Sequence, residues 1–415
     1  MPKKLLLFAP AAFNLAETSR MLEIAKGIRQ HPRACKRFEL AFISDGGEFE
    51  PLIEKHGFPL TRMEPRLTEE KIEHIARVDR GEKFAPALSD AELAERVNNE
   101  ITVLRNLQPV AVITGSYLTI PVTCRVLKIP LVWVIQSTWL PEFFCHGAGM
   151  TDGIRPRALK AVADWFVLRF INFWIKYGVL NSLNRTAKRF GVSGYNSIFE
   201  FWRGDITLVA EPAELTGNRL PPDHFFIGPL IPTDEFALPP EIAALSRDKP
   251  LVYFAMGSSG NPEIVAHILE SFAGKPYQVI APIKFQLSRL PAVRIPENVL
   301  VTNWLPALKV NRMADAAVIH GGIGTVMVAA LAGKPVVGVG MQMEQVANLA
   351  ALERLGFAIR IAKSHNPGAK VQRAIRVLLE DERAKKNAAA FAQITSQWDG
   401  PRLAAERLLK QYGER

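Results

Sequence analysis

The sequence predicts an α/β protein built from two parallel sheets, each covered by helices. Its 415 residues are enough for two domains of ordinary size, each with its own core. Short apolar runs alternate with amphipathic segments, and the runs are apolar on both faces, as strands buried between two helical layers are. A stretch dense in proline and acidic residues divides the chain. We therefore expect a first domain over 1–228, a linker over 229–250 and a second domain over 251–395.

Apolar runs mark the strands of the first domain, and segments with helical periodicity separate them. We expect strands at 4–9, 38–44, 110–114, 131–135, 205–209 and 225–228. We expect helices at 16–30, 50–56, 91–107 and 117–127, and a long helical segment at 155–190 that breaks near Gly178. Ligands of parallel sheets bind at the carboxyl ends of the strands, so functional residues are expected in the turns that follow these runs.

The second domain continues the same alternation. We expect strands at 251–255, 277–281, 299–302, 316–319, 335–339 and 357–361. We expect helices at 261–273, 349–355, 371–379 and 381–394.

The turn after the strand at 316–319 has the composition of an anion site. Glycines let a backbone approach a ligand closely, and the free N–H groups at the start of the following helix favour a phosphate. A histidine and a threonine hydroxyl add donors at the same place. The residues of this turn are His320, Gly321, Gly322, Gly324 and Thr325, with the helix expected to begin near Thr325.

The next strand, 335–339, leads into a loop that carries Glu344 and Gln345. Carboxylate and amide groups are suited to binding sugar hydroxyls. A phosphate-binding turn and a hydroxyl-binding loop therefore lie one βαβ unit apart, which indicates a nucleotide-sugar as the ligand.

These motifs, HGG-x-GT, AGKP and EQ-x-x-N, resemble the donor-site signature of GT-B glycosyltransferases, the group of antibiotic, macrolide, sterol and flavonoid glycosyltransferases. The resemblance is strongest over 251–361. It implies two Rossmann-like domains with parallel sheets that face a central cleft, and a helix in 396–415 that packs back on the first domain. It also implies inverting transfer of a sugar from a nucleotide-diphosphate donor to a hydroxyl of an apolar small-molecule or lipid-like acceptor. No cofactor or metal is expected beyond this co-substrate, and no Asp-x-Asp pair stands ready to bind a metal.

The resemblance assigns further donor residues and leaves the nucleotide open. Gly257 and Ser258 would lie against the pyrophosphate, and Trp304 and Leu305 would flank the base. Many members carry a glutamate for the ribose where this chain has Val328, and the usual Asp-Gln pair is Glu-Gln here. Both UDP-sugars and dTDP-sugars therefore remain candidate donors.

The candidate catalytic base lies after the first strand. The related enzymes place a His or Asp in a Gly-His-x-x-Pro or Gly-Asp-x-x-Pro loop, and the aligned segment AETSR puts Glu17 there, with Arg20 in the proline position. A partly buried carboxyl with a raised pKa can act as a base, although an acid in a first helical turn can also simply complement the helix dipole. Asn14 is a candidate acceptor ligand, and His146 is the alternative base.

The acceptor site is expected near the strand end at 136–153, where Trp139, Phe143 and Phe144 would line an apolar pocket. The helical segment 155–190 is rich in aromatic and basic residues. It would either contact a membrane or a lipid-like acceptor, or simply pack on the sheet.

Composition limits the other partners. The net charge of +10 comes without a nucleic-acid-binding motif, so we expect no nucleic-acid partner and consider a peripheral membrane contact instead. No stretch approaches the roughly 20 apolar residues that span a bilayer, and the apolar start reads as a strand rather than a signal peptide. Cys35, Cys124 and Cys145 have no metal spacing, which favours reduced thiols in a cytoplasmic protein, peripheral at the inner face of the membrane if it binds one.

Three alternative functions stay open at this stage. The chain could be a non-catalytic nucleotide-sugar-binding partner subunit, a GT-B enzyme that transforms the sugar itself, such as a 2-epimerase, or a membrane-associated lipid glycosyltransferase. The sequence names neither the sugar nor the acceptor, and the oligomeric state is unknown at this stage.

Overall fold

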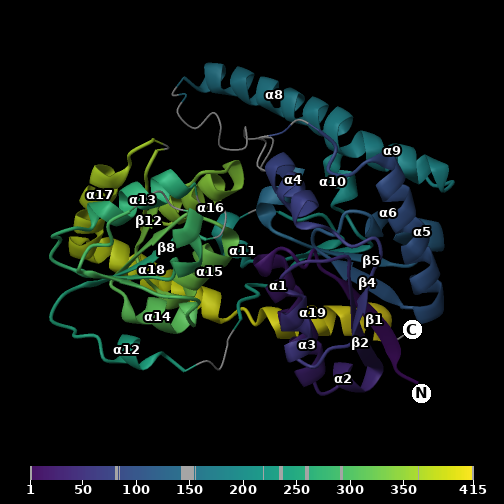
Figure 1. The fold of residues 1–415 in the computed structure, drawn as a ribbon, viewed down its shortest axis with the longest axis horizontal. Coiled ribbons are helices and arrows are strands. Elements are labelled where there is room, and N and C mark those ends of the chain that lie inside the picture. The colour runs from purple at the N-terminus through teal and green to yellow at the C-terminus, as the bar shows by residue number, and fades with distance from the viewer. Residues whose placement is uncertain are drawn as a thin grey trace.

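The computed structural model describes residues 2–79, 83, 85–141, 154, 156–217, 219–232, 237–257, 261–289, 293–362 and 364–413. Two α/β domains lie side by side (Figure 1), each built around one wholly parallel sheet. The first sheet has seven strands in the order β3-β2-β1-β4-β5-β6-β7, and the second has six in the order β10-β9-β8-β11-β12-β13. In each sheet the strand order reverses direction once, between β1 and β4 and between β8 and β11, and these points open a crevice for ligands.

The first domain spans strands β1 to β7. Its strands are β1 (Lys4–Ala9), β2 (Phe38–Ser44), β3 (Leu60–Arg62), β4 (Ala111–Thr114), β5 (Leu131–Ile135), β6 (Ile206–Val209) and β7 (His224–Phe226). Its helices are α1 (Leu15–Gln30), α2 (Ala34–Arg37), α3 (Glu50–Lys55), α4 (Glu69–Asp79), α5 (Asp90–Leu107), α6 (Ile120–Leu127), η1 (Ser137–Trp139), α8 (Arg157–Trp174), α9 (Leu180–Arg189), α10 (Ile198–Phe201) and α11 (Ala213–Thr216). Alternate residues of the strands enter two apolar clusters, one on each face of the sheet.

The second domain follows α12 (Pro240–Ala243). Its strands are β8 (Leu251–Ala255), β9 (Gln278–Ala281), β10 (Val299–Val301), β11 (Ala316–Ile319), β12 (Val336–Gly338) and β13 (Ala358–Arg360). Its helices are α13 (Pro262–Ser271), η4 (Lys284–Arg289), α14 (Ala307–Met313), α15 (Ile323–Ala332), α16 (Met343–Arg354), α17 (Gly368–Glu380) and α18 (Glu382–Ser396). Two more apolar clusters cover the two faces of this sheet.

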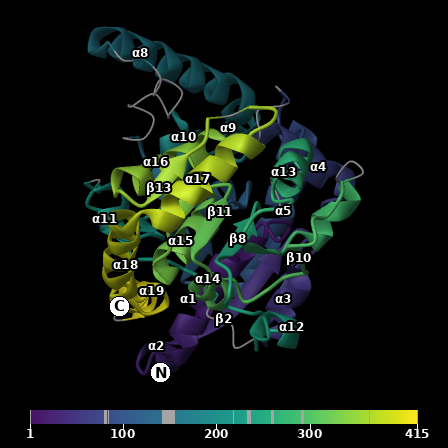
Figure 2. The same ribbon diagram turned by 90° about the vertical axis from the view of Figure 1, so that its left-hand side faces the viewer.

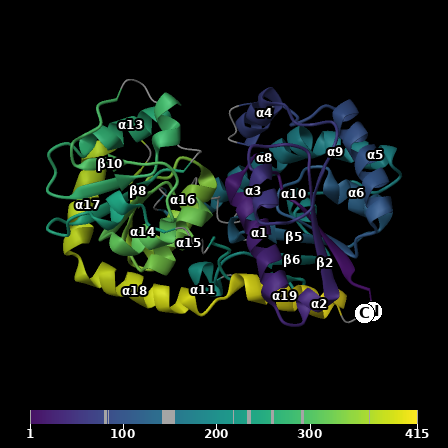
Figure 3. The same cartoon turned by 60° about the horizontal axis from the view of Figure 1, so that its bottom comes forward.

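The end of the chain returns to the first domain. Helix α18 runs beneath the second domain, and α19 (Gly400–Leu408) with η5 (Leu409–Gly413) continues beneath the first (Figure 3). There α19 packs against α1, and a side chain at Gly27 would overlap Pro401. Arg407 lies over the Phe225 ring at 3.2 Å, and Lys4 Nζ donates to the Tyr412 carbonyl at 3.0 Å. The C-terminal helices thus connect the two domains.

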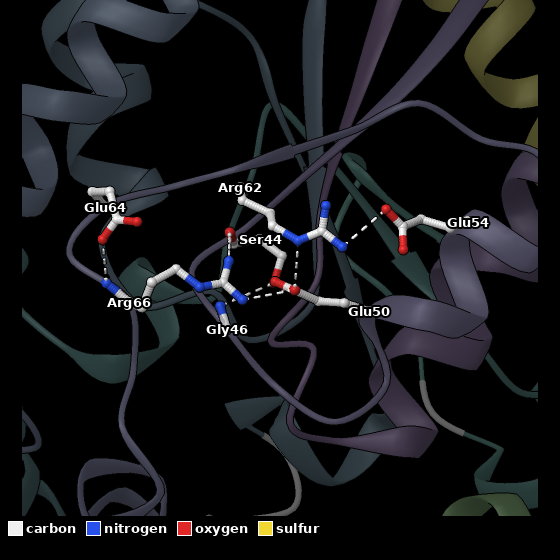
Figure 4. A network of polar contacts seen from close by, with 7 residues as sticks. All are labelled: Ser44, Gly46, Glu50, Glu54, Arg62, Glu64 and Arg66. Carbon is white, nitrogen blue, oxygen red and sulfur yellow. Dashed lines mark hydrogen bonds and ion pairs between the residues drawn. The ribbon is translucent and has the colours of Figure 1, made fainter.

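A network of charged residues holds the carboxyl edge of β2 and β3 (Figure 4). Glu50 Oε2 accepts hydrogen bonds from Arg66 Nη2 at 2.7 Å and from Arg62 Nε at 3.3 Å. Arg62 also donates to Glu54 Oε1 at 2.9 Å, and Arg66 Nη1 donates to the Ser44 carbonyl at 3.3 Å. Burial raises the pKa of Glu50, but the hydrogen bonds from Arg66 and Ser44 outweigh it and leave the pKa below its usual value. The network fixes the loop that lies beside the end of β1.

Two elements differ from the expectations drawn from sequence. The helix expected at 349–355 begins at Met343, six positions earlier, so Glu344 and Gln345 lie in its first turn rather than in a loop. The reason is a capping box between Gln342 and Gln345 that starts the helix there. The break expected near Gly178 is a π-helical turn, η3 (Ile175–Val179), which joins α8 to α9.

Candidate active site

Candidate site residues of each domain lie at the carboxyl ends of its strands, several of them beside the strand-order reversal. In the first domain, Thr114 Oγ1 donates to the Ala9 carbonyl at 2.8 Å and ties the end of β4 to that of β1. In the second, the ends of β8 and β11 meet at Gly257 and His320. Each domain therefore presents one polar site at the carboxyl edge of its sheet, where open α/β sheets bind ligands.

His320 directly follows β11 and is 7% exposed. Its Nδ1 lies 3.5 Å from the Ala255 carbonyl of β8. Burial lowers the pKa of His320 to about 4, and the contact with Ala255 only partly offsets this. The imidazole is therefore neutral at neutral pH, and an anion bound at its other nitrogen would favour the protonated form.

Glycines around this imidazole leave no room for side chains. Gly257, at φ +63°, would place a Cβ onto the His320 ring, and Gly322 would place one 2.5 Å from Nε2. Gly321, at φ +92°, requires a left-handed backbone. Gly322 caps α15 without a side-chain hydrogen bond, and a Cβ at Gly324 would meet open space. The first-turn amides of α15 thus have space beside them for an anion.

Thr325 and Gln345 use their side chains within the protein. Thr325 Oγ1 donates to the Gly322 carbonyl at 2.9 Å. Gln345 is buried, and its Oε1 accepts from Met341 N at 3.0 Å while its Nε2 donates to Gln342 Oε1 at 2.7 Å. Both groups support helix starts at the site instead of lying ready for a ligand.

Asn348 and Glu344 connect α16 to the site. Asn348 Nδ2 donates to the Gly321 carbonyl at 3.0 Å, so the EQ-x-x-N motif holds the glycine turn in place. Glu344 is half-buried in the first turn of α16. On the other side, Trp304 is 59% exposed and the half-buried Leu305 packs against the core just before α14. Four expected site residues, Phe143, Phe144, His146 and Ser258, lie outside the described residues.

Glu17 lies at the crevice of the first domain and is 0% exposed. Arg20 Nη2 donates to Glu17 Oε2 at 3.0 Å, and a side chain at Gly115 would overlap the carboxyl group. Burial raises the pKa of Glu17, with Arg20 and the backbone of Gly115 partly offsetting the effect. Because the Glu17 carboxyl is fully buried here, an acceptor oxygen can reach it only when neighbouring groups move.

The two other described candidates of the first domain serve its structure. Asn14 caps α1, because its Oδ1 accepts from Ala16 N at 3.0 Å and Glu17 N at 3.3 Å. Trp139 is half-buried and stacks on Trp202 at 4.7 Å between ring centroids. Among the described residues, no group of three or more His, Cys, Asp or Glu side chains could hold a metal ion.

Sequence reasoning missed a polar cluster at the ends of β5 and β6, made of Gln136, Ser137, Thr138 and Glu211. All four side chains are buried. Each follows an apolar strand, in LVWVI-QST and ITLVA-E, so the rule that ligands bind at strand ends could have singled them out.

Comparison with known proteins agrees with this arrangement. Residues 267–408 match the family described as EryCIII-like_C, Erythromycin biosynthesis protein CIII-like, C-terminal domain. A PGL/p-HBAD biosynthesis glycosyltransferase of Mycobacterium tuberculosis (strain ATCC 25177 / H37Ra) is 27% identical over 419 residues, 98% of this chain and 88% of its own. A PGL/p-HBAD biosynthesis rhamnosyltransferase of Mycobacterium bovis (strain BCG / Pasteur 1173P2) is 26% identical over 303 residues, 72% of this chain and 67% of its own.

Solved structures share the fold over the full length. Spinosyn forosaminyltransferase SpnP superposes with a TM-score of 0.69 at 16% identity and covers 100% of both chains. The glycosyltransferase VinC in complex with dTDP superposes with a TM-score of 0.68 at 16% identity and covers 98% of both. Two parallel-sheet domains, matched to these structures over the full length, define the GT-B fold. The chain is a glycosyltransferase of this class, similar to macrolide and antibiotic glycosyltransferases.

Proposed function

We propose that this enzyme transfers a sugar from a UDP- or dTDP-sugar to a hydroxyl group of an apolar small-molecule or lipid-like acceptor, with inversion and without a metal ion. The observation that carries the proposal is the uncapped start of α15, with the buried His320 beside it and Glu344 one βαβ unit away. The dTDP bound by VinC and the PGL/p-HBAD pathway of the relatives support the donor and acceptor classes.

In this mechanism the second domain binds the donor. The diphosphate lies against the first turn of α15 and His320, and these donors stabilise the negative charge that develops as it leaves. Glu344 accepts hydrogen bonds from the sugar. The acceptor oxygen attacks the anomeric carbon from the face opposite the diphosphate, the bond from that carbon to the phosphate oxygen breaks, and the acceptor proton passes to Glu17.

Turnover in the presence of a chelator tests the reaction and its metal independence. We expect release of nucleoside diphosphate from a UDP- or dTDP-sugar only when an apolar alcohol or phenol is present, at a rate that EDTA leaves within about twofold. The anomeric configuration of the product, read by proton NMR, should be inverted relative to the donor. Activity that EDTA removes and Mg²⁺ restores would contradict the metal-independent mechanism. Conversion of the donor without acceptor would favour an enzyme that transforms the sugar itself.

The acceptor side of the proposal includes contact with an anionic lipid surface through α8. The inner face packs on the first domain through Ile171 of α8 and Ile175 of the adjoining η3, while α8 extends across the top of the molecule and projects from it (Figures 1 and 2). The outer face of α8 and η3 carries large apolar side chains that are 53% to 67% exposed, and all but the adjacent pair Trp165 and Phe166 follow one another at three or four residues. We call this set the α8 stripe: Leu159, Val162, Trp165, Phe166, Phe170, Phe173 and Tyr177.

The positive charges beside the α8 stripe favour a lipid surface over a second protein as its binding partner. The Arg169 guanidinium lies 5.1 Å from the Trp165 ring, and Lys176 Nζ lies 5.7 Å from the Tyr177 ring, so cations stand at the level of the exposed rings. The whole chain carries a net charge of +10. Aromatic rings with neighbouring Lys and Arg suit a helix that lies in an anionic membrane surface. No helix in the described part of the chain is long and apolar enough to cross a membrane.

Vesicle sedimentation tests the α8 stripe. We expect the wild type to sediment with vesicles that contain phosphatidylglycerol and far less with pure phosphatidylcholine. The triple variant F166S/F170S/F173S should bind at least about tenfold more weakly, because each removed ring gives up apolar burial. The control variant V377S/I394S, which changes exposed apolar residues of α17 and α18, should bind as the wild type does. If the triple variant binds the vesicles as the wild type does, the lipid assignment is wrong. It is also wrong if the wild type is a dimer that the triple variant dissociates and the control variant does not.

A further inference from the structure

The polar cluster at the ends of β5 and β6 is the strongest unassigned feature of the molecule. Gln136, Ser137 and Thr138 follow β5, and Glu211 follows β6. None of the four is more than 5% exposed. Glu211 Oε2 accepts a hydrogen bond from Ser137 N at 3.1 Å, which joins the two strand ends. We call these four residues the β5–β6 cluster.

Two residues of the β5–β6 cluster have a buried side-chain oxygen without a hydrogen-bond partner in the part of the chain that the structure describes. These atoms are Gln136 Oε1 and Thr138 Oγ1, while the Ser137 hydroxyl lies beside the Glu211 carboxyl group. Buried polar atoms are normally satisfied, since leaving one unpaired is costly. Two such atoms beside a buried carboxyl group indicate a place where a ligand with several hydroxyl groups completes the hydrogen bonding.

The β5–β6 cluster faces the donor half of the site. Helix α16 of the second domain packs against η1 and α11, the two elements that contain or follow the cluster. Arg354 Nη2 of α16 donates to the Leu215 carbonyl of α11 at 3.3 Å. Burial raises the pKa of Glu211 to about 7, hydrogen bonds from Ser137 oppose this, and the charge of Glu344 adds to the rise. The negative charge of Glu344 on the second domain therefore acts on the carboxyl group of Glu211 on the first.

The chemistry of the β5–β6 cluster selects among ligands. The Gln136 amide oxygen and the Glu211 carboxylate accept hydrogen bonds, the Ser137 and Thr138 hydroxyls both donate and accept them, and the carboxylate repels phosphate. Metal ions need several charged ligands at one place, and the described residues contain no such group. A sugar ring, which presents several hydroxyl groups, matches these groups, and the charge of Glu344 on α16 acts on Glu211 from the second domain.

We propose that the β5–β6 cluster is a sugar-binding subsite that reads hydroxyl groups of the hexose carried by the donor, with Glu211 accepting one of them. This inference rests on the proposed function. The sugar then lies between Glu344 of the second domain and Glu211 of the first. Donor selection by sugar identity would depend on both domains, while binding of the nucleotide and its phosphates would depend on the second domain alone.

Comparison of two dissociation constants tests the subsite. Calorimetry gives the affinity of each variant for the sugar-nucleotide and for the matching nucleoside diphosphate. We expect Glu211→Gln and Thr138→Val each to weaken the sugar-nucleotide about tenfold or more while the nucleoside diphosphate changes less than about twofold. The control is Glu100→Gln, which changes an equally buried glutamate of the first domain that binds Thr119 and Thr123. It should change neither constant.

The outcomes separate the two proposals. Equal weakening of both ligands by Glu211→Gln and Thr138→Val, or no weakening of either, would overturn the subsite and leave the proposed function in place. If the wild type binds neither ligand, the donor site fails and the subsite fails with it. Thr138→Val has nearly the shape of the native side chain, so it keeps the test decisive if Glu211→Gln folds poorly.

Discussion

Replacing Glu17 with Gln is expected to lower kcat by about 100- to 10,000-fold, the range that a general base contributes. The amide keeps the shape of the carboxyl and fills the same space beside Gly115 and Arg20, but it cannot take the proton of the acceptor. Steady-state kinetics with saturating donor measure the effect, and KM for the donor should stay close to the wild-type value.

The direction in which activity changes with pH follows from the raised pKa of Glu17. Because burial raises the pKa of Glu17, the ionised base is lost at a higher pH than for an ordinary glutamate with a pKa of 4.5. The wild-type kcat/KM should therefore fall as pH drops through this raised pKa, and the Glu17→Gln variant should lose this limb of the profile. Stability changes the other way. The folded state holds the Glu17 proton more tightly than the unfolded chain, so ionising this group destabilises the wild type as pH rises from 4.5 through the raised pKa.

Glu23→Gln is the matched control for Glu17→Gln. Glu23 is also buried on α1, and it pairs with Lys26 three residues on at 2.8 Å, as Glu17 pairs with Arg20 at 3.0 Å. The control should keep the wild-type kcat. If Glu17→Gln also keeps kcat and only shifts the melting temperature, Glu17 is a structural ion-pair residue and the base must be sought elsewhere.

Replacing His320 with Ala is expected to reduce the stabilisation of the protein by sugar-nucleotides to half or less of the wild-type value. A ligand at about one hundred times its dissociation constant stabilises a fold by about 2.7 kcal/mol, which a thermal shift assay detects. The variant loses the imidazole next to the diphosphate and leaves a space between Gly257 and Gly322. We expect affinity to fall roughly 10- to 100-fold, as loss of a charge-assisted hydrogen bond implies.

Proton uptake supplies an independent readout for His320. The free imidazole has a pKa of about 4, and a bound diphosphate should raise it. Binding of a sugar-nucleotide to the wild type should therefore take up a proton and weaken as pH rises above 4 toward the pKa of the bound form. Calorimetry in two buffers of different ionisation enthalpy measures this uptake, which His320→Ala should remove.

His224→Ala is the control for His320→Ala, since His224 is a similarly buried histidine on β7 of the first domain. It should keep the full shift with sugar-nucleotides. A full shift in His320→Ala would contradict its role in donor binding. Absence of any shift in the wild type with every UDP- and dTDP-sugar would contradict the donor site as a whole.

The glycine turn between β11 and α15 was predictable from sequence because its parts are contiguous. A strand that ends in a histidine, two glycines and a helix start brings its backbone amides together through local geometry alone. The alternation of apolar runs and helical segments likewise predicted the α/β class, since buried parallel strands leave a strong local pattern. The strand β3 and helix α4 were not predicted, because β3 (sequence LTR) has no apolar run and α4 carries mostly charged residues.

The roles of single polar residues near helix starts were less predictable. Asn14, Thr325 and Gln345 were expected to bind ligands, and in the structure their side chains bond to nearby backbone or side-chain groups at the first turns of α1, α15 and α16. Backbone amides at helix starts compete with ligands for such side chains. Spacing along the chain does not show which of the two partners a side chain binds.

The chain order of residues determined the fold class, the glycine turn with His320 and the amphipathic pattern of α8, because each depends on neighbours within a few positions. Strand order and domain packing decided the rest. Ser137 and Glu211 lie 74 positions apart and meet only because β5 pairs with β6. The charge of Glu344 raises the pKa of Glu211 only because α16 of the second domain packs on the first domain. The outer face of α8 is exposed because the first domain buries only the opposite face. Such contacts join distant parts of the chain, so tertiary packing alone creates them.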